Sequence, residues 1–284
     1  MPGLRDIKRR IVSVQNTQKI TRAMKMVAAA RLRRAQEAIV RTRPYAQRMR
    51  QLAENIALRA DPNAHPLLRP GGRETIGLIV VTADRGLCGG FNHNIVAAAM
   101  RALNDRFSGR EVALTVVGRK GVEALRRRPC TIRAIHVDVY DKPVFRAAGE
   151  IVADLVADFA NNQTHEVYCL YNEFKSALAQ RVTLERLLPF EPASDKGVVP
   201  IDYLYEPDAG TVLDALLAKH VQVQMHRILH ESLAGEYGAR MTAMDAATNN
   251  AGDVIGRLTL KYNRARQDAI TKELIEVITG AEAL

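Results

Sequence analysis

The sequence predicts an α/β protein in which the two ends of the chain form a long antiparallel coiled coil and the middle forms a doubly wound α/β domain. Apolar residues recur at heptad spacing near both ends, and residues 208–284 contain no proline. Between the ends, short apolar runs alternate with helical patterns, which is typical of a parallel sheet covered by helices.

The N-terminal helix is predicted by a strict heptad register that begins at Leu4, shortly after Pro2, and continues to Ile56. Of its sixteen a and d positions twelve are apolar, and many are alanine, so a second helix backbone can approach closely along this face. Pro44 is expected to kink the helix rather than end it, because the register continues beyond this residue. The sixteen positions are Leu4, Ile7, Ile11, Val14, Gln18, Thr21, Lys25, Ala28, Leu32, Ala35, Ile39, Thr42, Ala46, Met49, Ala53 and Ile56.

The C-terminal helix is expected to begin after Asp208, a suitable N-cap residue. From Met241 onward its apolar positions recur at intervals of three and four residues, with Thr248 as the polar exception. One partner helix can cover such a narrow face, and the N-terminal helix, joined through the middle domain, would pair with it antiparallel. An ordinary helical bundle is the alternative, but it would need further apolar faces. The positions are Met241, Met244, Thr248, Ala251, Ile255, Leu258, Tyr262, Ala265 and Ala269.

The C-terminal tip is expected to extend beyond its partner helix. Pairing the two helices at equal rise per residue sets residue 4 opposite about residue 263, which leaves roughly 20 residues, or about 30 Å, without a partner. This tip is apolar around much of its circumference, so we expect it to be buried in another protein. Its large apolar residues are Ile270, Leu274, Ile275, Val277 and Ile278.

The middle of the chain contains five predicted strands and three predicted helices. The fifth strand follows the fourth too closely for a helical crossover, so it is expected to return as an antiparallel edge strand, and the expected strand order is 3-2-1-4-5. The strands are predicted at residues 76–82, 112–117, 131–138, 166–171 and 180–187, and the helices at 94–107, 120–127 and 144–161.

The predicted domains follow from these elements. They are an N-terminal coiled-coil helix at 1–59, a Rossmann-like α/β domain at 74–192 and a C-terminal coiled-coil helix at 208–284, with the two helices forming one shaft. Stretches rich in proline and glycine, at 61–72 and 189–207, are expected to link them.

Composition excludes several classes of protein. The chain has 284 residues, of which 47% are hydrophobic, and no uninterrupted apolar run reaches the length of a membrane span. The N-terminus lacks the apolar block of a signal peptide, so we expect a cytosolic protein. Such a protein can still belong to a membrane-attached assembly. Cys88, Cys130 and Cys169 are widely spaced without a CxxC motif, which favours free thiols in a reducing compartment.

The net charge of +10 is concentrated in the first helix. Residues 1–60 contain 15 Lys and Arg against three acidic residues. A nucleic-acid-binding basic coiled coil is one interpretation of this excess of positive charge. No aromatic residues for base stacking are interleaved with the arginines, and one side of the helix packs on its partner helix. We therefore expect the basic face to contact an acidic protein surface rather than nucleic acid.

Two motifs are weak candidates for ligand sites. The loop at 84–92 contains several glycines after the first strand but matches neither phosphate-binding spacing, and no basic residue follows the glycines, so a tight turn is preferred over a nucleotide site. His226 and His230 have the spacing of a two-histidine metal face, but no further ligand is evident and an exposed helix face is preferred. No catalytic grouping stands out, so no enzyme activity, cofactor or metal is predicted.

Four segments of the chain resemble the gamma-subunit family of F-type ATP synthases. They are residues 23–30 (AMKMVAAA), 84–90 (DRGLCGG), 239–247 (ARMTAMDAA) and 262–276 (YNRARQDAITKELIE), and the resemblance runs from end to end. It implies a non-catalytic rotary central stalk at the cytoplasmic face of the cell membrane, whose coil turns inside a ring of alpha and beta subunits. The middle domain and the lower end of the coil would meet the epsilon subunit and the membrane c-ring. Rotation driven by proton flow would then drive ATP synthesis at beta-subunit sites.

The resemblance also implies roles for individual residues. Arg266 and Gln267 match a pair that catches a beta-subunit loop, and Arg85 matches a basic contact to an acidic beta-subunit lever. The apolar tip, Ile270 to Ile278, would lie in a bearing formed by the ring. Lys25 receives no fixed role, because its charge varies within the family. The other positions grouped around the coupling region are Met24, Arg240, Thr271 and Glu273.

Overall fold

The computed structural model describes residues 4–58, 65–72, 74–190, 206 and 208–282. The chain divides into two compact units, one formed by residues 1–29 with 240–284 and one by residues 30–239. Two long helices, α1 (Leu4–Ala57) and α5 (Ala209–Glu282), contribute to both units. The predicted domain ends at 59 and 192 and most of the predicted linkers lie outside the described residues, so the division into three domains stays a prediction.

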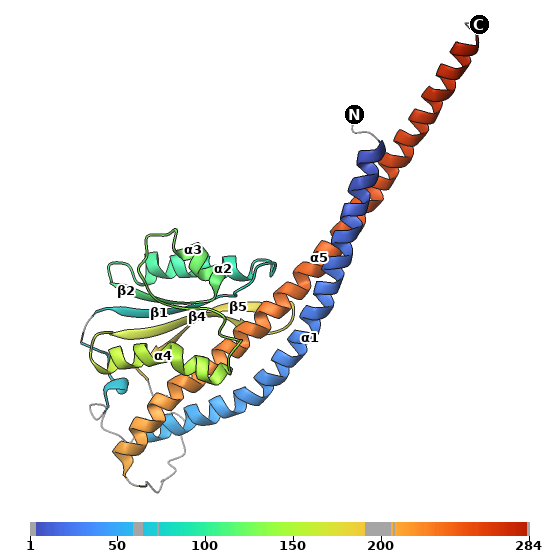
Figure 1. The fold of residues 1–284 in the computed structure, drawn as a ribbon. Helices are drawn as coiled ribbons and strands as arrows, with labels where there is room; N and C mark the ends of the chain where they lie inside the picture. Colours follow the sequence, from blue (N-terminus) through green and yellow to red (C-terminus); the bar gives the residue numbers. More distant parts are fainter. Residues whose placement is uncertain (1–3, 59–64, 73, 191–205, 207, 283–284) are drawn as a thin grey trace. The chain divides into compact units, whose positions relative to one another are not determined.

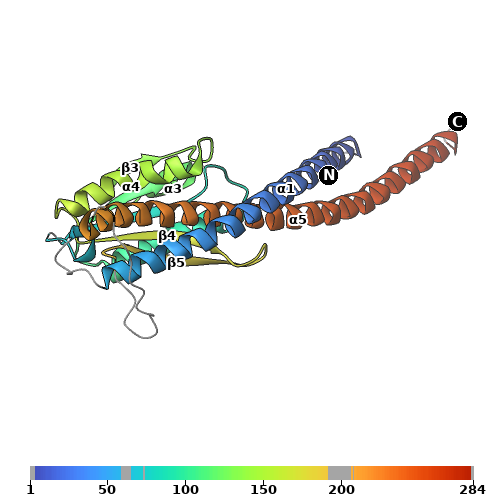
Figure 2. The same ribbon diagram turned by 90° about the horizontal axis from the view of Figure 1, so that it is seen from below.

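The first unit is a two-helix antiparallel coiled coil, as the sequence predicts (Figures 1 and 2). Within it, the Oγ1 of Thr248 on α5 donates to the Oγ1 of Thr21 on α1 at 2.8 Å, and Gln18 Nε2 donates to the Thr248 carbonyl at 3.3 Å. The one polar position of the α5 register therefore faces a polar position of the α1 register. This match satisfies both hydroxyl groups where an apolar neighbour would leave them unpaired.

The burial of the two helices confirms the heptad registers. All sixteen predicted positions of α1 and all nine of α5 are buried or half-buried, whereas most residues between them are exposed. Pro44 lies inside α1 and does not end it. Asp208 caps α5 as predicted, because its carboxylate accepts hydrogen bonds from the Thr211 amide at 2.9 Å and the Thr211 hydroxyl at 2.7 Å.

The second unit is built on a five-stranded mixed sheet of order β3-β2-β1-β4-β5, which confirms the predicted topology. Three strand pairs are parallel, and the pair of β4 with β5 is antiparallel. The strands are β1 (Ile76–Val81), β2 (Val112–Val117), β3 (Ile132–His136), β4 (Glu166–Phe174) and β5 (Gln180–Leu188).

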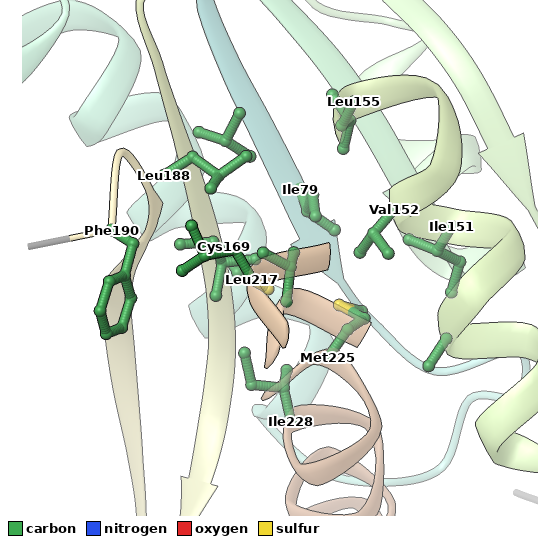
Figure 3. Close-up of a cluster of buried hydrophobic side chains, with 14 of the residues drawn as sticks. Ile79, Ile151, Val152, Leu155, Cys169, Leu188, Phe190, Leu217, Met225 and Ile228 are labelled. Carbon is green, nitrogen blue, oxygen red and sulfur yellow. The ribbon is translucent and has the colours of Figure 1, made fainter. Parts of the chain in front are cut away.

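Helices cover both faces of this sheet (Figure 1). Alternate residues of β1 pack on α2 (Phe91–Arg101) and α3 (Arg119–Leu125), and the others pack on α4 (Val144–Ala160) and α5. Because β1 is buried on both faces, its sequence is a continuous apolar run without alternation. Figure 3 shows the core on the α4 and α5 side, where Ile79 and Cys169 of the sheet lie near Leu217, Met225 and Ile228 of α5.

Two predictions within this unit were wrong in detail. The predicted helix at 94–107 begins three residues earlier at Phe91, whose side chain is buried, and ends in a π-helical turn, η2 (Ala102–Arg106). Part of the predicted first linker is packed structure, because the 3-10 helix η1 (Pro66–Leu68) buries Leu67 in the core. A single anchoring apolar side chain in each case outweighs the local propensity for turns.

Candidate functional site

The residues assigned by resemblance fall into a coil group and a loop group. Extending the Thr21–Thr248 pairing one residue for one residue places Leu4 opposite about residue 265. Arg266 and Gln267 therefore lie where the described part of α1 ends, and both side chains are exposed. Thr271 and Glu273 follow on the exposed continuation of α5. These four polar residues therefore all lie on one short exposed segment of α5.

The tip beyond them is apolar and exposed within the chain. Ile270, Leu274, Ile275, Val277 and Ile278 each expose between 50% and 70% of their surface. Soluble helices rarely keep so many large apolar side chains in water on adjoining faces. The segment therefore has the properties of a surface that another protein covers.

Met24 and Arg240 lie deeper in the coil unit. Met24 is half-buried, and Arg240 exposes only 8% of its surface. By the same pairing, Arg240 lies opposite about residue 29, roughly one and a half helical turns from Met24. Neither side chain is freely exposed, in contrast to those of Arg266 and Gln267.

Lys25 has a definite partner that the sequence reading did not identify. Its Nζ lies 2.5 Å from Asp245 Oδ1, and both side chains are about half exposed, at 42% and 45%. The signal was present in the sequence, because Lys25 occupies a seam position of α1 and Asp245 follows a seam position of α5. Only the antiparallel offset of the two helices, which the structure supplies, pairs them.

The loop that contains Arg85 is held rigidly by its neighbours. Asn92 Oδ1 accepts a hydrogen bond from the Ala83 amide at 2.9 Å, and Asp84 Oδ1 accepts one from the Arg119 amide at 3.0 Å. Leu87 has a positive φ of 64° and exposes 64% of its surface. The loop therefore presents Arg85 and Leu87 outward from a fixed backbone, in agreement with the predicted tight turn.

The hairpin between β4 and β5 packs closely on residues 235–238 of α5. A Cβ on Gly238 would lie 2.9 Å from the Ala177 carbonyl oxygen, and a Cβ on Gly235 would lie 3.3 Å from the Phe91 ring. Glycine at these positions lets both the hairpin and the start of α2 approach the helix. The Arg85 loop and the hairpin are thereby anchored on residues 235–239.

The two histidines of α5 do not form the exposed face that the sequence favoured. His226 and His230 are partly buried, with their Nε2 atoms 3.1 Å apart, and the His226 ring packs edge-on against Phe145 of α4. Burial and, to a smaller extent, the neighbouring His226 together lower the pKa of His230 to about 4. Among the described residues no group of three or more His, Cys, Asp or Glu side chains could hold a metal ion.

Two further observations concern the cysteines and the hydropathy of the helices. Cys88, Cys130 and Cys169 are free thiols. Within the described residues, no helix is both long enough and apolar enough to cross a bilayer.

Comparison with known proteins gives the family. A family model described as ATP synthase matches residues 3–284. A protein of Geobacter sp. (strain M21) named ATP synthase gamma chain is 49% identical over 100% of this chain and 99% of its own length. The chain belongs to the ATP synthase gamma-chain family. A gamma chain of Anaeromyxobacter sp. (strain Fw109-5) is 47% identical, with full coverage of both chains.

Solved structures agree with the family. A chain in the central stalk and c-ring structure of the Tetrahymena thermophila mitochondrial ATP synthase is 26% identical with a TM-score of 0.62, over 80% of this chain and 99% of that chain. A chain of the Euglena gracilis mitochondrial ATP synthase shares the fold, with 17% identity and a TM-score of 0.72 over 99% of this chain and 94% of that chain. These matches support a central-stalk role, and none supports the nucleic-acid alternative.

Proposed function

We propose that the chain is the rotating central stalk of a bacterial F-type ATP synthase, a non-catalytic subunit that transmits torque between a membrane c-ring and a ring of alpha and beta subunits. Its full-length similarity to gamma chains supports the assignment. The observation that carries the mechanical part is the exposed apolar tip of α5, because such a surface needs a surrounding partner.

The proposed mechanism uses the coil as an asymmetric shaft. As it turns, Arg266 and Gln267 engage a beta-subunit loop at the level where the described part of α1 ends. Thr271, Glu273, Met24 and Arg240 act in the same coupling region, and the tip turns in an apolar bearing. An electrostatic contact between Arg85 and an acidic beta-subunit segment transmits force at the α/β domain. The nucleotides that react are bound at the sites of the ring.

The remaining partners in the proposal are the epsilon subunit and the c-ring, both on the side of the α/β domain. This arrangement locates the chain peripherally, at the cytoplasmic face of the cell membrane. Proton flow through the c-ring then turns the shaft and drives ATP synthesis. In the reverse direction, ATP hydrolysis turns the shaft and pumps protons.

The test is assembly and coupling of the complex in inverted membrane vesicles. We expect the full chain to co-purify with alpha, beta, epsilon and c subunits, and the double change Arg266→Ala and Gln267→Ala to reduce ATP-driven proton pumping several-fold while assembly is retained. Lys261→Ala is the matched control, because Lys261 is an exposed cation on the paired part of the same helix. Failure of the chain to co-purify with alpha and beta would refute the central-stalk role. Equal pumping by the double variant and the control would refute the roles of Arg266 and Gln267.

A further inference from the structure

A basic groove lies between α2 and α3 on one face of the sheet. It encloses about 490 Å³, and the polar side chains that line it include Asn92, His93, Lys120, Arg127 and Arg128. A volume of this size lies within the range of pockets that bind small molecules. The proposed rotary function assigns no role to this groove.

The position of Lys120 is fixed by the way α3 packs on the end of β1. The Lys120 amide donates to the Ala83 carbonyl at 3.1 Å, and the Gly121 amide donates to Thr82 Oγ1 at 2.9 Å. Gly118 allows this approach, because it has a φ of 94° and a Cβ there would lie 2.3 Å from the Thr82 carbonyl oxygen. Tertiary packing thereby supplies a basic residue beside the glycine loop, where the sequence showed none.

The charges of the groove are only partly satisfied. Lys120 Nζ pairs with Glu123 at 2.6 Å, and Glu123 is the one acidic residue that lines the groove in the described part of the chain. The side chains of Arg127 and Arg128 make no hydrogen bond or ion pair with another described residue. Three cations and one carboxylate leave an excess positive charge that a bound anion would neutralise.

The spacing of the cations indicates the size of the anion. Lys120 lies in the first turn of α3 and Arg127 in the turn that follows its last residue, so cations lie at both ends of the groove. Two or more linked anionic groups could reach both ends. No Phe, Tyr or Trp lines the described groove, so it offers no platform for stacking a nucleobase.

We propose that the α2–α3 groove binds a small polyphosphate, held at one end by Lys120 and at the other by Arg127 and Arg128. Arginine forks bind phosphate oxygens through paired charge-assisted hydrogen bonds. His93 and the side-chain amide of Asn92 offer further N–H donors along the groove. Inorganic polyphosphates and the phosphate tail of a nucleotide share this chemistry, and the experiment separates them.

The test is calorimetric titration of the purified full chain with pyrophosphate, tripolyphosphate, ATP and orthophosphate, at two salt concentrations. Tripolyphosphate should bind at least about tenfold more tightly than orthophosphate, because it spans both ends of the groove. ATP binding as tight as tripolyphosphate would indicate a nucleotide tail as the ligand, and weaker ATP binding would indicate an inorganic polyphosphate. Either result supports the groove chemistry.

Matched variants test the location. The double change Arg127→Ala and Arg128→Ala should weaken tripolyphosphate binding at least about tenfold, since two charge-assisted contacts are lost. Arg101→Ala with Arg126→Ala removes the same charge from exposed positions that do not line the groove, and it should leave the affinity within about twofold. Circular dichroism checks that both variants fold.

Equal loss of tripolyphosphate affinity in both variants would show general charge attraction and overturn the proposal. Absence of tripolyphosphate binding, or tighter binding of a glutamate-rich peptide than of tripolyphosphate, would also overturn it.

Discussion

At the scale of single residues, Arg227 joins α5 to the sheet through a buried ionic network. Its guanidinium makes two bonds to the Glu185 carboxylate, at 2.6 and 2.8 Å, and also donates to Tyr171 and Glu231. Its side chain is only 15% exposed, and that of Glu231 only 3%. Arg43 of α1 provides a second cation for Glu231 at 3.4 Å. The network therefore joins four elements: α1, β4, β5 and α5.

Removing Arg227 should destabilise the second unit strongly. We expect Arg227→Met to lower the free energy of unfolding by about 3–5 kcal/mol, because Glu185 loses its bidentate partner and Glu231 keeps only Arg43. Arg181→Met is the control: Arg181 pairs with Glu173 but is 66% exposed, so its loss should cost about 1 kcal/mol or less. Urea unfolding of the two variants measures the difference. Similar midpoints would contradict the stabilising role of the buried network.

His220 should make the second unit sensitive to acid. Burial, together with the charges of Arg50 and Arg227, lowers the pKa of His220 to about 4, although Glu185 opposes this effect. In the unfolded chain the pKa is near 6.5, so between about pH 6.5 and pH 4 the unfolded state binds more protons, and stability falls as pH falls. His220 should account for a loss of about 3 kcal/mol by pH 4.

The measurement is the free energy of unfolding from pH 7 to pH 4, for the natural chain and for His220→Leu. The variant has no titrating group at this position, so its stability should fall less steeply over that window. His226 and His230 are present in both proteins, so their contributions cancel. Parallel pH profiles would show that His220 is not held neutral by burial.

At the scale of elements, the coil depends on a narrow face of small and apolar residues. The Thr21–Thr248 pairing, extended along both helices, places Ile255 opposite about Val14, and both are half-buried. A two-helix coil has no further layer that could solvate a charge placed on this face. Leu260 lies on the same stretch of α5 but is 72% exposed.

These two positions form a matched test of the coil. Ile255→Asp should destabilise the coil by about 3 kcal/mol, because it places an unpaired carboxylate between the helices. Leu260→Asp adds the same charge on the exposed side and should cost less than about 1 kcal/mol. Native-state hydrogen exchange of the amides at 240–262 measures both. Equal protection in the two variants would argue against the antiparallel pairing.

At the scale of the whole molecule, the chain carries a surface that it does not cover itself. The tip of α5 has no described partner helix beyond about residue 265. Each of its large apolar residues exposes at least 50% of its surface. Its contribution to folding within the chain is therefore small.

Two truncations separate folding from assembly. Removal of residues 280–284 should leave the unfolding of the isolated chain unchanged and retain most proton pumping in the complex. Removal of residues 270–284 should also leave the remaining helix folded, but pumping should fall several-fold because the apolar tip is lost and Arg266 lies near a fraying end. Circular dichroism and pumping assays measure the two effects. Unfolding of the isolated chain by the short truncation would show that the tip packs within this chain.

Much of the fold could be predicted because its signals are periodic and local. The heptads of α1 and α5 repeat over many turns, and β1 is an unbroken apolar run because helices cover both its faces. The short interval before β5 required an antiparallel return. Assignments of single residues such as Arg266 came from family resemblance and not from periodicity, so they stay predictions until the complex is tested.

The sequence by itself determined which residues of each helix face its partner along the coil, the order of the strands and the apolar character of the tip, because hydrophobic burial imposes a repeat that can be recognised along one chain. Only the tertiary structure decided which side chains from distant segments meet. It paired Lys25 with Asp245, packed His226 against Phe145 of α4, and brought Lys120 beside the loop after β1. Such contacts depend on the offset and approach of whole elements, which no local pattern in the sequence encodes.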